Sequence, residues 1–152
     1  MLPLVAPRAV IELSFDPILT IGGVSVRLET LGAQLPIPHG IACGTTLAGI
    51  TAANVAALES RDPSSAALGR YATLGRLLAG LPEGTPAPEA RAALVAELRR
   101  WTAALAIPGL GHFGLTQAGI PAIVADGRGS SMKTNPVVLT DEELAEVLRA
   151  AL

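Results

Sequence analysis

The chain has 152 residues, a formal net charge of −2 and one cysteine, with 50% hydrophobic and 16% charged residues. This length suits one domain, and the charge excludes a nucleic-acid binder that works by neutralising phosphates. A single cysteine excludes an intramolecular disulfide framework and a zinc site with several cysteines. So apolar a chain is not intrinsically disordered.

Membrane spans and targeting signals are not expected. No stretch of about 18 residues is apolar without interruption, and the best candidate, 41–58, contains three threonines and one asparagine. The N-terminal segment lacks a basic region, and Pro3, Pro7 and Arg8 interrupt its apolar run, which is not typical of a signal peptide. We therefore expect a cytoplasmic protein that does not associate with a membrane.

The first residues, 1–17, are predicted to be extended, and 4–13 has the composition of a short edge strand because it contains a proline. Asp16 and Pro17 are typical of a helix start. Ile18, Ile21, Val24, Leu28 and Leu31 then form a helical apolar stripe, and Gly32 stands where the helix would end.

The remaining chain predicts further helices with proline, serine and glycine signals at their ends. The capping box formed by Thr140 and Glu143 predicts the last helix start. Leu77 and Leu105 lie in the apolar stripes of two of these helices, and the last helix is expected to bury Leu144, Val147, Leu148 and Leu152. The predicted helices run over 38–60, from Ser64 or Ser65 to Gly80, 88–106, 121–126 and from Thr140 onward. Residues 18–152 are thus predicted to form one all-α domain of five to six helices.

His39 is the leading candidate for a functional residue. It directly follows Pro38, which is predicted to open a helix, so its imidazole lies at the positive end of the helix dipole. That field favours the neutral imidazole, which is the form that binds a metal. Gly40 beside it would let a ligand approach closely. The alternative is a helix-start histidine that hydrogen-bonds a neighbouring carbonyl.

Glu29 is the candidate partner of His39. It lies ten residues earlier, across a proline-rich turn that could bring its carboxylate back towards the imidazole. A carboxylate and an imidazole together suit iron, zinc or manganese. The alternative for Glu29 is an exposed residue that pairs with Arg27 or with solvent.

Three other features have mainly structural interpretations. Cys43 is expected to be a buried, inert thiol, although its spacing from His39 permits a Cys–His pair on one helix face. His112 lies in a glycine-rich loop, where it either closes over a site or is simply exposed. Residues 109–114 match the pattern G-x-G-x-x-G, but no strand precedes them, so a dinucleotide site is rejected.

Several segments in the same order resemble iron-containing alcohol dehydrogenases. LGAQLPIPHGIACGTTLAGITAANVA, residues 31–56, is similar to the region where that family has Leu-Gly followed by a Pro-His-Gly helix start. GRYATLGRLL (69–78) and LAIPGLGHFGL (105–115) are similar in order and spacing. NPVVLTDEELAEVLRAAL (135–152) resembles the family's closing Asn-Pro-x-x-Leu-Thr-x-x-Glu helix. The resemblance covers about residues 18–152.

The resemblance implies a C-terminal helical domain that holds a catalytic divalent iron or zinc, next to an N-terminal domain that binds NAD(P). His39 corresponds to the last histidine among the family's metal ligands. Ser25 stands where the preceding ligand is expected, and Glu29 replaces a further active-site histidine. The other two ligands and the cofactor domain would precede Met1. His39 and Glu29 are thus the predicted metal residues, and no catalytic or NAD(P)-binding residue is assigned.

The resemblance therefore implies an oxidoreductase domain that interconverts alcohols and aldehydes together with a nucleotide-binding partner chain. One alternative is a non-catalytic helical interaction module with the same scaffold. Another is a small-molecule binding protein that uses the loop around His112. Because exposed apolar patches mark interfaces, we expect a homo-oligomer or a complex with the partner, formed through the helices around 18–60.

Overall fold

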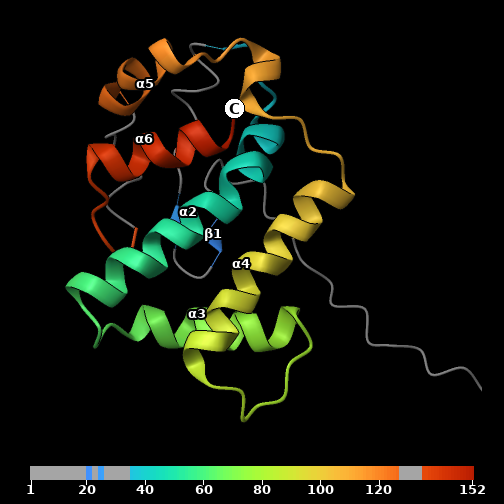
Figure 1. Ribbon diagram of the computed structural model, residues 1–152, viewed down its shortest axis with the longest axis vertical. Helices are drawn as coiled ribbons and strands as arrows, with labels where there is room; N and C mark the ends of the chain where they lie inside the picture. The colour runs from blue at the N-terminus through green and yellow to red at the C-terminus, as the bar shows by residue number, and fades with distance from the viewer. Residues whose placement is uncertain (1–19, 22–23, 26–34, 127–134) are drawn as a thin grey trace, which may run out of the picture.

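A computed structural model of the protein describes residues 20–21, 24–25, 35–126 and 135–152. The described residues form five α-helices, so the predicted all-α fold is confirmed (Figure 1). Two short 3₁₀ helices, η1 (Leu110–Phe113) and η2 (Gln117–Gly119), connect α4 to α5. The α-helices are α2 (His39–Arg61), α3 (Ala66–Leu78), α4 (Ala87–Ala104), α5 (Ile120–Asp126) and α6 (Asp141–Ala150).

The prediction of a helix after Pro17 is wrong for residues 20–21 and 24–25, the part of that region that the structure describes. Thr20–Ile21 (β1) and Val24–Ser25 (β2) are two antiparallel strands, with Thr20 opposite Ser25. The two residues between them in the sequence are both glycine, a pair that favours hairpins over helices. The predicted extended segment 1–17 lies outside the described residues.

Helix α2 is the central element, and α3, α4 and α6 all pack against it (Figure 1). Among the described residues it is the one helix with the length and composition of a membrane span, with a mean hydropathy of 1.5. However, 56% of that stretch is buried inside the protein. Alanine, glycine and threonine are frequent in α2 and allow its neighbours to approach closely from several sides. This degree of burial is typical of a helix in the core of a fold.

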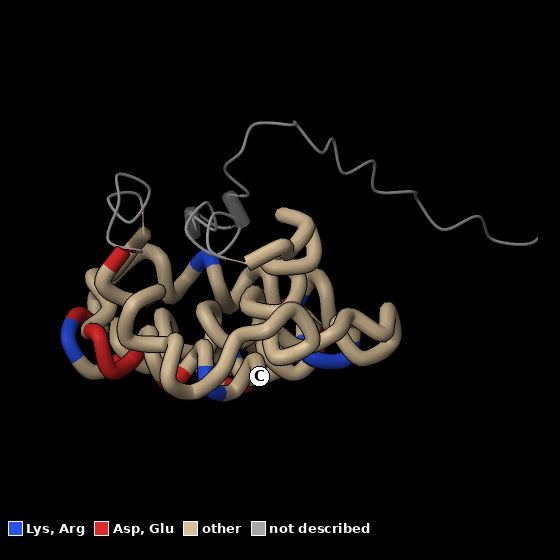
Figure 2. Tube along the Cα trace, turned by 90° about the horizontal axis from the view of Figure 1, so that it is seen from above, with Lys and Arg blue, Asp and Glu red and all other residues tan. Residues whose placement is uncertain are grey.

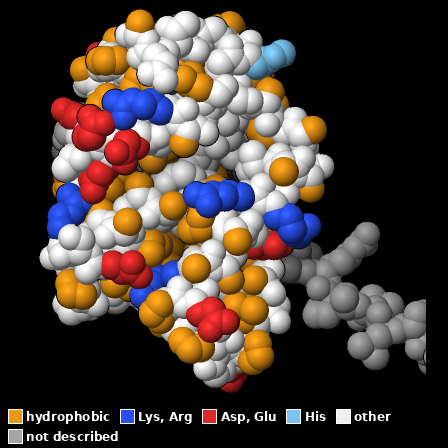
Figure 3. Space-filling view, in the orientation of Figure 1, with side chains coloured by type: hydrophobic (Ala, Val, Ile, Leu, Met, Phe, Trp, Pro, Cys, Tyr) orange, Lys and Arg blue, Asp and Glu red, His pale blue; other side chains and the backbone are white. Residues whose placement is uncertain are grey.

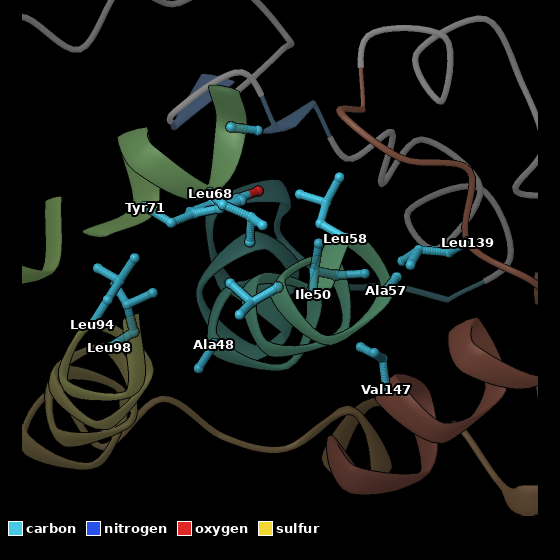
Figure 4. Packing of buried hydrophobic residues seen from close by; sticks show 12 residues of the cluster. Ala48, Ile50, Ala57, Leu58, Leu68, Tyr71, Leu94, Leu98, Leu139 and Val147 are labelled. Atoms are coloured by element: carbon cyan, nitrogen blue, oxygen red, sulfur yellow. The ribbon is translucent and has the colours of Figure 1, made fainter. Parts of the chain in front are cut away.

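The core has two parts that lie along α2. Figure 4 shows the first, in which side chains of α2, α3, α4 and α6 converge, with Leu58, Tyr71 and Leu94 nearly inaccessible to solvent. The second lies around the beginning of α2 and is formed with η1, α5 and α6. Its buried members are Ile37, Ala42, Cys43, Leu110, Leu115, Ile120, Ile123, Val124, Ala145 and Leu148. The first turn of α2 is therefore held by its own apolar cluster.

Charged residues contribute little to this interior. Figure 2 shows them mostly at the outer edges of the helix assembly, with long uncharged stretches between them. The predicted capping box at the start of α6, which contains the charged Glu143, is confirmed. The Glu143 amide donates to the Thr140 hydroxyl at 3.2 Å, and the Thr140 amide donates to the Glu143 carboxylate at 2.7 Å. Arg61 pairs with the same carboxylate at 3.0 Å and so connects α2 to α6.

Helix α4 ends in a Schellman motif that contains an unusual residue. The Ile107 amide donates to the Thr102 carbonyl at 3.1 Å, and the Ala106 amide donates to the Ala103 carbonyl at 3.0 Å. Ala106 has φ +49°, although this position strongly favours glycine. Helix α3 ends in the same way with Gly80 at φ +63°.

We expect Ala106→Gly to raise the free energy of unfolding by about 0.5 to 1 kcal/mol, because glycine adopts the left-handed conformation without strain. Gly80→Ala is the matched control, with an expected loss of similar size. Urea unfolding followed by circular dichroism measures both variants. A destabilised Ala106→Gly variant would contradict this assignment of strain.

Candidate functional site

His39 is the first residue of α2, as the sequence predicts. The Pro38 carbonyl accepts from the amides of Ile41 at 3.0 Å and Ala42 at 3.1 Å, which closes the first turn. The His39 side chain is exposed. A Cβ built on Gly40 would meet no atom of the described residues within 4 Å apart from the neighbours and backbone of its own helix. The imidazole is thus accessible to a ligand from solvent.

Cys43 lies one turn further along α2, and its Sγ is 3.4 Å from Nε2 of His39. The thiol is buried in the second core cluster. This burial raises the pKa of Cys43, since a thiolate would lose solvation there. The free chain therefore holds a protonated thiol beside the imidazole. This agrees with the interpretation of Cys43 as unreactive and argues against a thiolate nucleophile.

The other predicted ligand position is not described. Glu29 lies outside the described residues, so its approach to His39 stays a prediction. Ser25 is described through its backbone, in β2. His112 is exposed in η1, where its ring lies edge-on against Phe113 with 5.0 Å between the centroids.

The donor set was tested against the metal that the resemblance implies. No group of three or more His, Cys, Asp or Glu that could hold a metal ion occurs within the described ranges 35–126 and 135–152. What the structure does bring together is one imidazole nitrogen and one sulfur. A thiolate and an imidazole together suit a borderline or soft divalent cation such as zinc.

A surface cavity was not foreseen from the sequence. It has a volume of about 600 Å³ and lies between α2, the end of α4 and the end of α6. Gly49, Arg99, Thr102 and Ala106 are among its lining residues. The run of small residues in α2 is the sequence feature that relates to this cavity. Small residues are equally typical of close helix packing, so this run does not predict a cavity. On the face drawn in Figure 3, acidic and basic side chains lie together in a few small groups, with apolar and backbone atoms between these groups.

Comparison with known proteins supports the fold through structure rather than sequence. No protein-family model and no curated protein matches the chain. The structure of a 1,3-propanediol oxidoreductase is similar, with a TM-score of 0.69 and 21% identity over 82% of this chain and 31% of that one. A variant of an archaeal halo-thermophilic alcohol dehydrogenase from a Red Sea brine pool has a TM-score of 0.63 and 22% identity over 77% of this chain and 29% of that one.

The chain has the fold of the helical domain of iron-containing alcohol dehydrogenases. The fold expected from the resemblance is therefore confirmed. The 152 residues span less than a third of the length of either structure. The TM-scores of 0.69 and 0.63 support the architecture. At identities of 21% and 22% the similarity shows the fold alone, so metal binding and catalysis are proposals.

Proposed function

We propose that the chain is the helical, metal-binding part of an oxidoreductase that interconverts alcohols and aldehydes with NAD(P). The observation that carries this proposal is the likeness of fold to two oxidoreductases of this kind, combined with an exposed histidine at the Pro-His-Gly helix start. The cofactor would be bound by a nucleotide-binding domain outside these residues. We propose that a partner chain supplies that domain.

The described residues have a limited role in this reaction. Pro38 and the second core cluster hold the first turn of α2 in place, so the backbone that carries the His39 side chain has a fixed position. Glu29 is proposed as a further ligand, from the segment before α2. A divalent iron or zinc ion held there would supply Lewis-acid polarisation of the alcohol or aldehyde oxygen.

A non-catalytic helical interaction module is the second candidate function. It is favoured by the finding that no group of three metal-binding side chains occurs in the described part of the chain. Catalytic metal sites normally use three protein ligands or more. A module of this kind would use the same scaffold for association alone.

Metal content and activity separate the two functions. We expect the purified chain to retain a divalent metal and, with a stoichiometric nucleotide-binding partner, to oxidise NADH or NADPH in the presence of propanal. His39→Ala is expected to lose both properties, and His112→Ala, which changes the other histidine, to keep both. Inactivity with partner and added iron or zinc would refute the dehydrogenase proposal. An assembly whose stability is independent of His39, with no bound metal, is the result expected for the interaction module.

Association is part of the proposal. A homo-oligomer or a complex with the partner is proposed through the region around 18–60, in which ten of the 23 residues of α2 are already buried within the chain. The exposed large apolar side chains of the described residues are Leu77, Leu105, Val138 and Leu152. Light scattering on the chain with and without the partner reports this assembly. A cytoplasmic location is also proposed.

A further inference from the structure

His39 and Cys43 are four residues apart on one helix, so their side chains lie on the same face, one above the other. Their polar atoms already face each other, with Cys43 Sγ 3.4 Å from His39 Nε2. When Nδ1 carries the ring proton, the thiol donates its hydrogen to Nε2. The Nε2 lone pair then points at the thiol hydrogen, and loss of that proton would leave a sulfur lone pair beside the same nitrogen.

The 3.4 Å separation matches the geometry of a shared metal ion. Zinc binds sulfur at about 2.3 Å and imidazole nitrogen at about 2.0 Å with tetrahedral geometry, which places the two donor atoms about 3.5 Å apart. The two side chains therefore need no backbone movement to chelate one ion. A small rotation of the exposed His39 ring is sufficient to direct Nε2 at it.

Solvent reaches the described part of this turn. His39 is exposed, and apart from the neighbours and backbone of its own helix, no atom of the described residues lies within 4 Å of a Cβ built on Gly40. The backbone under both donors is held by α2 and the second core cluster. The first turn of α2 contains no acidic residue, so a Cys43 thiolate would be the one anionic donor that this turn can provide.

We propose that Cys43 is a metal ligand together with His39, and that this pair takes a borderline divalent cation, zinc above all, rather than iron. Thiolate and imidazole are donors that zinc prefers. The inference rests on the metal site of the proposed function and refines it by adding Cys43 to the ligands and by naming the cation. On binding, the thiol proton leaves to solvent, sulfur and Nε2 each donate an electron pair to the ion, and no atom changes oxidation state.

Cobalt(II) is the probe that tests this pair, because ligation by a thiolate produces a near-ultraviolet sulfur-to-cobalt charge-transfer band. Cys43 is the only cysteine of the chain, so such a band can arise from no other side chain. We expect the full 152-residue chain under reducing conditions to show the band on titration with cobalt, and zinc to abolish it by displacement. One proton should be released for each zinc bound.

Variants assign the two donors. Cys43→Ser is nearly isosteric and should abolish both the band and the proton release. His39→Asn should weaken cobalt binding by about tenfold or more, since even indirect partners of metal ligands contribute that much. His112→Asn should change neither. Circular dichroism spectra establish that each variant is folded.

The opposite results are equally clear. Absence of cobalt binding, binding without the charge-transfer band, or an unchanged band in Cys43→Ser would each overturn the proposal. These results are independent of the proposed function. A chain that shows the band but gives no NAD(P)H oxidation with the partner would retain the ligand pair and refute the activity. An enzyme that is active with the partner, and whose activity Cys43→Ser leaves unchanged, would retain the proposed activity and refute Cys43 as a ligand.

Discussion

Replacing Gly75 with alanine is expected to lower the free energy of unfolding by about 2 kcal/mol or more, because α3 and α4 touch at this residue. A Cβ at position 75 would overlap the backbone carbonyl oxygen of Ala90 and lie 2.7 Å from its carbonyl carbon. Ala90 is fully buried in α4 and cannot yield as a flexible side chain would. The helices must therefore separate, at an overpacking cost of about 1–3 kcal/mol or more.

Gly69→Ala is the matched control in the same helix. A Cβ at this position meets no atom within 4 Å, and Gly69 is exposed, so alanine should stabilise α3 by about 0.5–1 kcal/mol. Urea unfolding of both variants therefore isolates the contact with α4 from the helix propensity of alanine. Equal changes in the two variants would show that α3 and α4 are not in contact at Gly75.

The second large effect is expected from Asn54→Leu, which removes a fully buried amide. Asn54 is 0% exposed and exchanges two hydrogen bonds with Asn135, at 3.0 and 2.8 Å. Its Nδ2 also donates to the Tyr71 hydroxyl at 3.4 Å, and the amide of Asn135 donates to the Val137 carbonyl at 2.6 Å. The network thus connects α2 to α3 and to the segment that leads into α6.

We expect Asn54→Leu to lose about 3 kcal/mol of stability, since it removes two hydrogen bonds from the half-buried Asn135 amide and one from the buried Tyr71 hydroxyl, and each unsatisfied buried group costs about 1–3 kcal/mol. Burial raises the pKa of Tyr71 to about 12, against the hydrogen bond from Asn54. The hydroxyl is therefore neutral and still polar at pH 7. Thermal unfolding measured by calorimetry gives the change.

A double-mutant cycle with Asn135→Ala tests the reciprocal pair. The combined variant Asn54→Ala plus Asn135→Ala should lose clearly less than the sum of its single variants, because each single change leaves the other amide unpaired. Tyr71→Phe is the control that removes only the long hydrogen bond, and a smaller loss is expected. Strictly additive losses would contradict a coupled amide pair.

The helix starts were predictable because their signals act within one turn of the chain. Pro38 lacks an amide hydrogen and opens α2, and Thr140 and Glu143 satisfy each other's amides at the start of α6. Such signals need no distant partner. The two strands around Thr20 and Ser25 differ from the predicted helix, because two consecutive glycines favour a hairpin even where apolar residues recur at helical spacing.

The candidate site was predictable only where its residues lie within about one helical turn of each other. His39 and its contact with Cys43 lie within one turn of α2, so sequence spacing was sufficient to suggest the pair. The pairing of Asn54 with Asn135 joins residues 81 positions apart. No local pattern indicates such a partner, although both asparagines lie in segments that resemble the dehydrogenase family.

By itself, the sequence determined that the chain is helical, where α2, α3, α4 and α6 begin, and that His39 stands at a helix start, because proline, caps and apolar spacing act locally. Only the tertiary structure decided which faces are buried. Leu77 and Leu105 are each 72% exposed although they lie in the predicted apolar stripes, whereas Gly75 lies in the contact between α3 and α4. The physical reason is that a stripe shows where apolar residues recur, while burial depends on how closely a neighbouring helix can approach.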